Sequence, residues 1–142
     1  MAVNGANMDA VSFVVTGLPV SRLDHGLNNI HFGDNGELYI QSGSNTNGGV
    51  PGGLSSSNIM GENYFSASTI VAHMGETCFD GDIAYDADID GFPIAGYGPT
   101  GVEVFAAGTR NPFGVVLHSN GNLYGTGKNL QHDSLLTGFL PW

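Results

Sequence analysis

Short apolar runs, separated by small polar residues and glycine, follow one another along the chain. Residues 11–16, 66–72 and 102–105 are rich in β-branched or aromatic side chains, and the last run alternates apolar and polar positions. Runs of this kind, bounded by Gly, Pro, Asn and Ser, are typical of strands. No segment shows the spacing of an amphipathic helix. The pattern therefore predicts an all-β protein.

One strand–turn–strand pattern occurs twice. Asn35-Gly36 lies between two apolar runs in residues 30–40, and Asn120-Gly121 lies between two apolar runs in residues 115–125, which is 85 positions later. Asn-Gly between alternating apolar residues is a strong hairpin signal. Because Leu-Tyr follows both turns in the same register, we interpret the pair as a repeat of the β-propeller kind. The alternative is two unrelated hairpins that share a common turn.

The spacing of 85 residues exceeds the roughly 40–50 residues of compact propeller repeats. Either the repeat carries long Gly-, Ser- and Asn-rich loops, for which residues 41–63 and 91–101 qualify, or a degraded repeat lies between the two. The strands would fill about two blades, whereas propellers close with about four to eight. We therefore expect residues 1–142 to be a partial propeller, whose open edges require another chain or self-assembly.

Composition limits the function classes. The hydrophobic fraction of 41% can build a core, but the charged fraction of 11% is too low to solvate several amphipathic helices. Three basic residues against thirteen acidic ones give a net charge of −10. We therefore expect no nucleic-acid partner and no anionic membrane surface, since both are bound by clustered Lys and Arg. No signal peptide is visible at the amino terminus, and the compartment stays open.

The acidic residues are concentrated in one segment. Asp86, Asp88, Asp90 and Gly91 reproduce the D-x-D-x-D-G opening of a calcium loop, in which alternate oxygen ligands precede a sharp turn. Tyr97 stands where such a loop ends in a bidentate Glu. The segment is therefore either a Ca²⁺ site of another kind or a solvated acidic loop.

Two further places could carry chemistry. His25 follows Asp24 in a loop before the first hairpin, where a carboxylate could orient a general base; the alternative is a solvated histidine. Arg110 and Asn111 lie in a predicted tight turn, residues 108–114. A guanidinium there suits recognition of an acidic cofactor or substrate, and the alternative is an Arg that ties down the acidic loop.

These segments together resemble the glucose/sorbosone dehydrogenase family. Asp24-His25-Gly26, the first hairpin with Phe-Gly-Asp-Asn-Gly-Glu-Leu-Tyr, and Gly108-Thr-Arg-Asn-Pro-Phe-Gly114 before the second hairpin match its motifs in order and rough spacing. The resemblance covers residues 18–126. It implies a six-bladed propeller that oxidises a sugar with pyrroloquinoline quinone and Ca²⁺, in members that are often secreted or periplasmic.

The resemblance also implies residue roles. His25 would be the general base that takes the proton from the sugar hydroxyl as hydride passes to the quinone, and Arg110 and Asn111 would contact the acidic quinone. After the second Leu-Tyr the chain departs from the family pattern, because Lys128 stands where an acidic, calcium-holding loop is usual. The alternative function is therefore a non-catalytic, calcium-stabilised β scaffold or carbohydrate-binding module.

Overall fold

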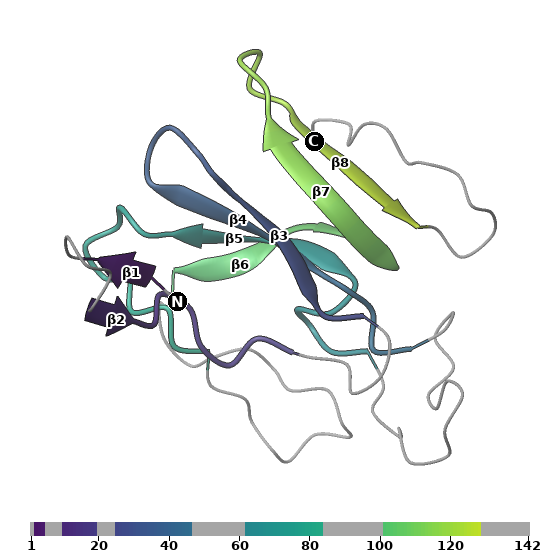
Figure 1. Ribbon diagram of the computed structural model, residues 1–142, viewed down its shortest axis with the longest axis horizontal. Coiled ribbons are helices and arrows are strands. Elements are labelled where there is room, and N and C mark those ends of the chain that lie inside the picture. The colour runs from purple at the N-terminus through teal and green to yellow at the C-terminus, as the bar shows by residue number, and fades with distance from the viewer. Residues whose placement is uncertain (1, 5–9, 20–24, 47–61, 84–100, 129–142) are drawn as a thin grey trace.

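The computed structural model describes residues 2–4, 10–19, 25–46, 62–83 and 101–128. These residues form three antiparallel sheets and no helix, and none of the sheets closes on itself (Figure 1). The all-β prediction is confirmed for this part of the chain. No helix in the described ranges is long and apolar enough to cross a membrane.

A four-stranded sheet occupies the centre. Its strands are β3 (Leu27–Phe32), β4 (Glu37–Ser42), β5 (Ser68–His73) and β6 (Val102–Ala107), and each pairs with the next strand in chain order. Two two-stranded sheets accompany it. One consists of β1 (Ala2–Asn4) and β2 (Ala10–Ser12), and the other of β7 (Asn111–Leu117) and β8 (Leu123–Lys128).

The two predicted hairpins, β3–β4 and β7–β8, have the same backbone design. The amide of Gly33 donates to the carbonyl of Glu37 over 2.9 Å, and 85 residues later the amide of His118 donates to the carbonyl of Asn122 over 2.9 Å. Gly36 and Gly121 have φ values of 89° and 83°, a region that glycine enters without strain. Both hairpins are thus confirmed down to the turn.

The strand registers repeat as well. Phe32 pairs with Leu38 as Leu117 pairs with Leu123, and both registers shift toward the start of the first strand, just beyond Leu27 and Pro112 respectively. A bulge at equivalent places is a specific backbone feature that chance hairpins rarely share. The repeat of 85 residues is therefore structural. The two strands described between the hairpins, β5 and β6, extend the sheet of the first hairpin.

The central sheet is covered on both faces. On one face a cluster of buried side chains, comprising Leu38, Ile40, Phe65, Ile70, Ala72 and Ile83, packs beneath the segment that contains Val14, Val15 and Leu18. On the other face Tyr39 and Val71 pack against Leu123, Val115 and Leu117 of the second hairpin. We call these the inner face, which bears Leu38, and the outer face, which bears Tyr39.

Two local predictions were wrong. A strand over residues 11–16 was expected, but β2 ends at Ser12, because Val14 and Val15 leave it to pack on the inner face. Residues 108–114 were expected to be a tight turn, but β7 begins at Asn111. Pro112 is tolerated inside this strand because it sits beside the bulge, where a missing N–H costs little.

Candidate functional site at one end of the central sheet

The end of the central sheet at which β3 begins and β4 ends is held together by backbone hydrogen bonds. The amide of Gly43 donates to Gly26, and the amide of Ala67 donates to Gly43. The carbonyl of Ala67 accepts from the amides of both Gly108 and Thr109, at 2.8 and 2.9 Å. Four chain segments are thereby fixed side by side. All three sequence-predicted site residues within the described ranges lie at this end.

His25 is nearly enclosed there, with only 8% of its surface exposed. Its Nδ1 lies 3.3 Å from the carbonyl oxygen of Ser44 and 3.2 Å from the Ser44 hydroxyl. The single hydroxyl proton of Ser44 is already directed to the carbonyl of Thr46 over 2.8 Å. Nδ1 must therefore be the donor to Ser44. This hydrogen-bond pattern places the proton of the neutral imidazole on Nδ1 and leaves Nε2 unprotonated.

Gly43 leaves the space that His25 occupies. A Cβ at Gly43 would lie 2.4 Å from the Cβ of His25, closer than two such carbons can approach. The absence of a side chain therefore lets the segment before β3 cross directly over the end of β4. Asp24, which was expected to orient His25, lies outside the described residues. The orienting group in the structure is Ser44, and the sequence gives no signal for it.

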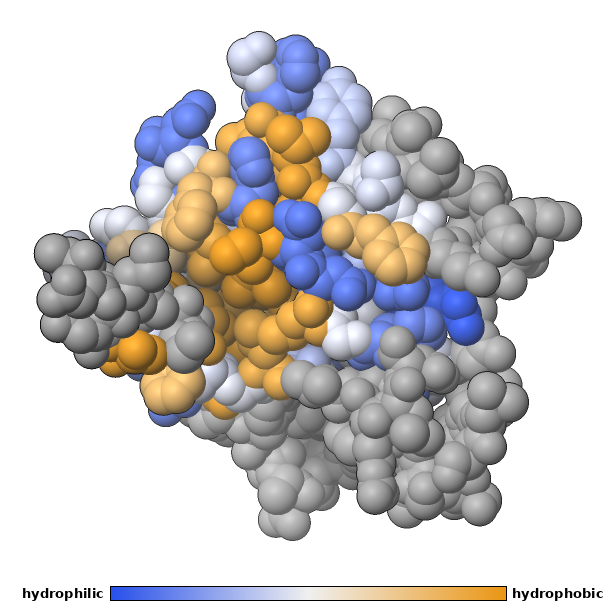
Figure 2. Space-filling model, viewed as in Figure 1, coloured by the Kyte–Doolittle hydropathy of each residue, from blue (hydrophilic) through white to orange (hydrophobic). Residues whose placement is uncertain are grey.

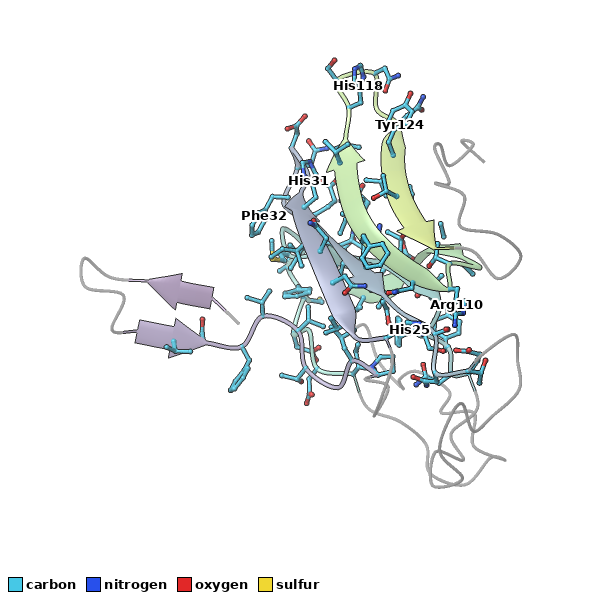
Figure 3. All side chains as sticks on the ribbon, turned by 45° about the vertical axis from the view of Figure 1, so that its right-hand side comes forward. His25, His31, Phe32, Arg110, His118 and Tyr124 are labelled. Atoms are coloured by element: carbon cyan, nitrogen blue, oxygen red, sulfur yellow. The ribbon has the colours of Figure 1, made fainter. Side chains whose placement is uncertain are left out.

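Arg110 reaches the same end of the sheet through its backbone. Its carbonyl accepts a hydrogen bond from the amide of Ser44 at 2.8 Å, so one residue contacts both His25 and Arg110. Figure 3 shows these two residues close together, whereas His31, His118 and Tyr124 lie toward the opposite end. The structure therefore brings together two residues that are far apart in the sequence.

Asn111 joins the central sheet to the second hairpin. Asn28 of β3 donates from Nδ2 to the side-chain oxygen of Asn111 at 3.0 Å and also donates to the carbonyl of Pro112. Thr109, which lies two residues before Asn111, is buried, and its hydroxyl has no hydrogen-bond partner among the described residues. A buried hydroxyl of this kind is a group that a ligand or a water molecule can satisfy.

A partly buried acidic clasp, which sequence analysis missed, stabilises the loop after β4. The carboxylate of Glu62 accepts hydrogen bonds from the amides of Asn45 and Thr46, both at 2.9 Å, and from the hydroxyls of Ser66 and Thr46. Burial alone would raise the pKa of Glu62, but these hydrogen bonds outweigh it and lower the pKa. Glu62 is therefore a structural anion that holds the Ser44 loop in place.

The predicted calcium ligands Asp86, Asp88 and Asp90 lie outside the described residues. Within the residues that the structure does describe, no group of three or more His, Cys, Asp or Glu side chains is placed to hold a metal ion. The calcium expectation thus stays a prediction.

Comparison with known proteins identifies no relative, since no protein-family model, no curated protein and no solved structure matches the chain.

Proposed function

We propose that the chain is a portion of an aldose-dehydrogenase-like quinoprotein propeller of the glucose/sorbosone dehydrogenase kind. In this proposal the four-stranded sheet is one blade, and β7–β8 is the first half of the next. The internal repeat supports this architecture, because hairpins with the same turn, register and bulge recur, and the first of them begins a four-stranded antiparallel sheet. Each blade of a propeller is such a four-stranded sheet.

The observation that carries the chemistry is the hydrogen-bond pattern at Nδ1 of His25, from which its tautomer is assigned. Because Nδ1 donates to Ser44, Nε2 is the basic nitrogen, and the ring is held in place by the loop that Glu62 stabilises. A fixed imidazole of this kind can take the proton of a sugar hydroxyl while hydride leaves the carbon that bears this hydroxyl. Pyrroloquinoline quinone, when bound, would supply the two-electron acceptor for that hydride.

The groups around His25 fit an acidic quinone in kind. The guanidinium of Arg110 is suited to bidentate pairing with a carboxylate, and the buried hydroxyl of Thr109 is an unused donor beside it in the chain. The Glu62 carboxylate keeps its negative charge, and its four hydrogen bonds direct it to the amides of Asn45 and Thr46 and to the hydroxyls of Thr46 and Ser66. Arg110 and Asn111 would hold the quinone, and His25 would serve the sugar.

The proposal is tested by adding pyrroloquinoline quinone, Ca²⁺ and an aldose to the chain and following dye reduction. His25→Asn keeps an N–H donor near the Nδ1 position but removes the base, so we expect a rate about 10²–10⁴-fold lower. His118→Asn, at the opposite end of the molecule, is the matched control and should retain the full rate. Cofactor absorbance gives a second measurement, in which Arg110→Lys should weaken quinone binding and His25→Asn should not.

A second function, the non-catalytic calcium-stabilised or carbohydrate-binding scaffold, is favoured by one observation. The register of β7 and β8 places Lys128 directly opposite Asn111, and the family resemblance leads one to expect a calcium-holding acid in this segment instead of a cationic residue. This alternative gains support if the chain shows neither dye reduction nor a quinone absorbance change, while a chelator still lowers its melting temperature. The dehydrogenase proposal would then be contradicted for this chain.

A further inference from the structure

The contact between the central sheet and β7–β8 is a template for a second contact of the same kind. In the existing contact the outer face of the central sheet presents Tyr39, and the second hairpin presents Val115, Leu117 and Leu123. The side chains form one hydrophobic cluster, and β7 lies against both β3 and β4. We call the surface of a hairpin at the position of Tyr39 its receiving face. We call the surface formed by Val115, Leu117 and Leu123 on the next hairpin its docking face.

The first hairpin still carries a docking face of its own. By the 85-residue repeat, Val115 and Leu117 correspond to Ile30 and Phe32 of β3, and these are also apolar. Leu38, the equivalent of Leu123, belongs to the inner-face cluster that Val14, Val15 and Leu18 already cover. The part of this docking face that stays open is therefore the β3 edge, where Ile30 is 56% exposed and Phe32 is 63% exposed. Side chains of this size are seldom left exposed together unless something packs on them.

The second hairpin likewise carries a receiving face. Tyr124 is the equivalent of Tyr39 and pairs with Val116 across the two strands. Tyr39 is buried against the next hairpin and against Phe105 of its own sheet, whereas Tyr124 is 38% exposed and Val116 is 50% exposed. Phe113, near the start of β7, is exposed as well. Figure 2 shows hydrophobic residues gathered across the face of the molecule where Figure 1 places β3 and β7.

We infer that a second copy of this chain docks head-to-tail, with the Ile30–Phe32 docking face of one copy on the Val116–Tyr124 receiving face of the other. The occupant is a second copy because the complementary half of each exposed face is present on the same molecule, with residue types that already pack together inside it. The inference rests on the internal repeat and on no catalytic step, so it goes beyond the proposed dehydrogenase function and can fail separately from it.

The two faces are different surfaces, so the contact is heterologous. A heterologous contact leaves one docking face and one receiving face unused in any open assembly, and each can add a further copy. Assembly therefore continues until a ring closes or a longer array forms. Because each copy has a net charge of −10, the copies repel at low ionic strength, and association should strengthen as salt is added.

The test is sedimentation of the chain over a range of concentrations, with one variant for each face. Phe32→Asp blocks the docking face, and Val116→Asp blocks the receiving face. The unaltered chain should form oligomers that grow with concentration. Each variant alone should associate at least about tenfold more weakly, because a charge would be buried without a partner. Tyr64→Asp is the control, since Tyr64 is an exposed aromatic residue outside both faces and its loss should leave assembly unchanged.

Mixing the two variants gives the decisive result. Phe32→Asp retains a sound receiving face and Val116→Asp retains a sound docking face, so an equimolar mixture should form a one-to-one dimer that goes no further. Far-ultraviolet circular dichroism of each variant checks that it is folded. The inference is overturned if the unaltered chain stays monomeric at all concentrations, or if folded variants fail to pair when mixed. Either result leaves the quinone and dye measurements of the proposed function unaffected.

Discussion

The two hairpins of this protein share one backbone but differ in what surrounds them. In β3–β4 the central strand β4 is paired on both sides and all but its first residue are buried, whereas β7–β8 is a two-stranded sheet that is covered on one face. Turn hydrogen bonds, glycine conformations and the bulge are nonetheless equivalent. The comparison shows that local sequence specifies the hairpin, while burial depends on which neighbour covers it.

The turns also differ in how their side chains support the backbone. In the first hairpin the Glu37 carboxylate accepts from the Asn35 amide at 3.0 Å. In the second hairpin the corresponding position is Asn122, and the support comes from Asn120, whose side-chain oxygen accepts from the Asn122 amide at 2.9 Å. The equivalent asparagine amide therefore donates to the Glu37 carboxylate in one copy and, at 3.1 Å, to Nδ1 of His118 in the other.

The largest expected effect concerns the two equivalent leucines. Leu38→Ala and Leu123→Ala each remove a buried side chain, and each should lower the free energy of unfolding by about 2–5 kcal/mol. Leu38→Ala should cost more, because Leu38 belongs to a cluster of six buried residues and Leu123 to one of three. Urea denaturation measures both. Leu27→Ala, at a partly exposed position, is the control; if Leu123→Ala costs no more than this control, the second hairpin does not pack in solution.

The next prediction distinguishes two causes of destabilisation in the turns, which are backbone strain at a positive φ and steric contact with a nearby residue. Gly121→Ala should cost about 1–2 kcal/mol, because an L residue is strained at a φ of 83° and nothing else lies within 4 Å of the added carbon. Gly36→Ala should cost more, since the added carbon would also lie 3.2 Å from the amide nitrogen of Gly75. Gly26→Ala, where space is open and φ is not positive, is the matched control. Equal losses at Gly36 and Gly121 in thermal melts would show that the Gly75 contact is absent.

The smallest expected effect is the loss, at acid pH, of the hydrogen bond by which Glu37 supports the turn of the first hairpin. The pKa of Glu37 lies below its ordinary value because its carboxylate accepts hydrogen bonds from its own amide and from the Asn35 amide. A lowered pKa means that the stabilisation is present above pH 4.5 and is lost as the pH falls through the folded-state pKa. The Asn35 amide resonance should therefore shift below pH 4.5 and titrate with Glu37. Glu37→Gln should abolish this shift, and a shift that persists in the variant would remove Glu37 as its source.

Much of the fold follows from local patterns in the sequence. Asn35-Gly36 and Asn120-Gly121 predicted both hairpins, and β-branched runs predicted the strands that became β5 and β6. The prediction for the end of the first strand was wrong because Val14 and Val15 pack against a core formed by distant residues. The prediction for the start of β7 was wrong because proline is disfavoured in strands except at a bulge. The bulge beside Pro112 depends on the partner strand.

Less of the candidate site was predictable. His25, Arg110 and Asn111 were singled out by residue type, and the structure places all three at one end of the central sheet. The connection of His25 to Arg110 through Ser44, and the clasp of Glu62 on the loop that holds Ser44, arise from contacts between residues 16 to 66 positions apart in the chain. Contacts of that range follow from the packing of whole strands and leave no short sequence motif.

β3 and β7 lie against one another without sharing a sheet, and the polar link between them is made by the side chain of Asn28. We call this contact the seam. It has no ladder of backbone hydrogen bonds to fix the angle between the two sheets. Substitutions along the seam can therefore rotate one sheet against the next while each sheet stays intact. In the proposed propeller, a small rotation at each seam would accumulate around the ring, so a few seam residues would determine how many sheets complete it.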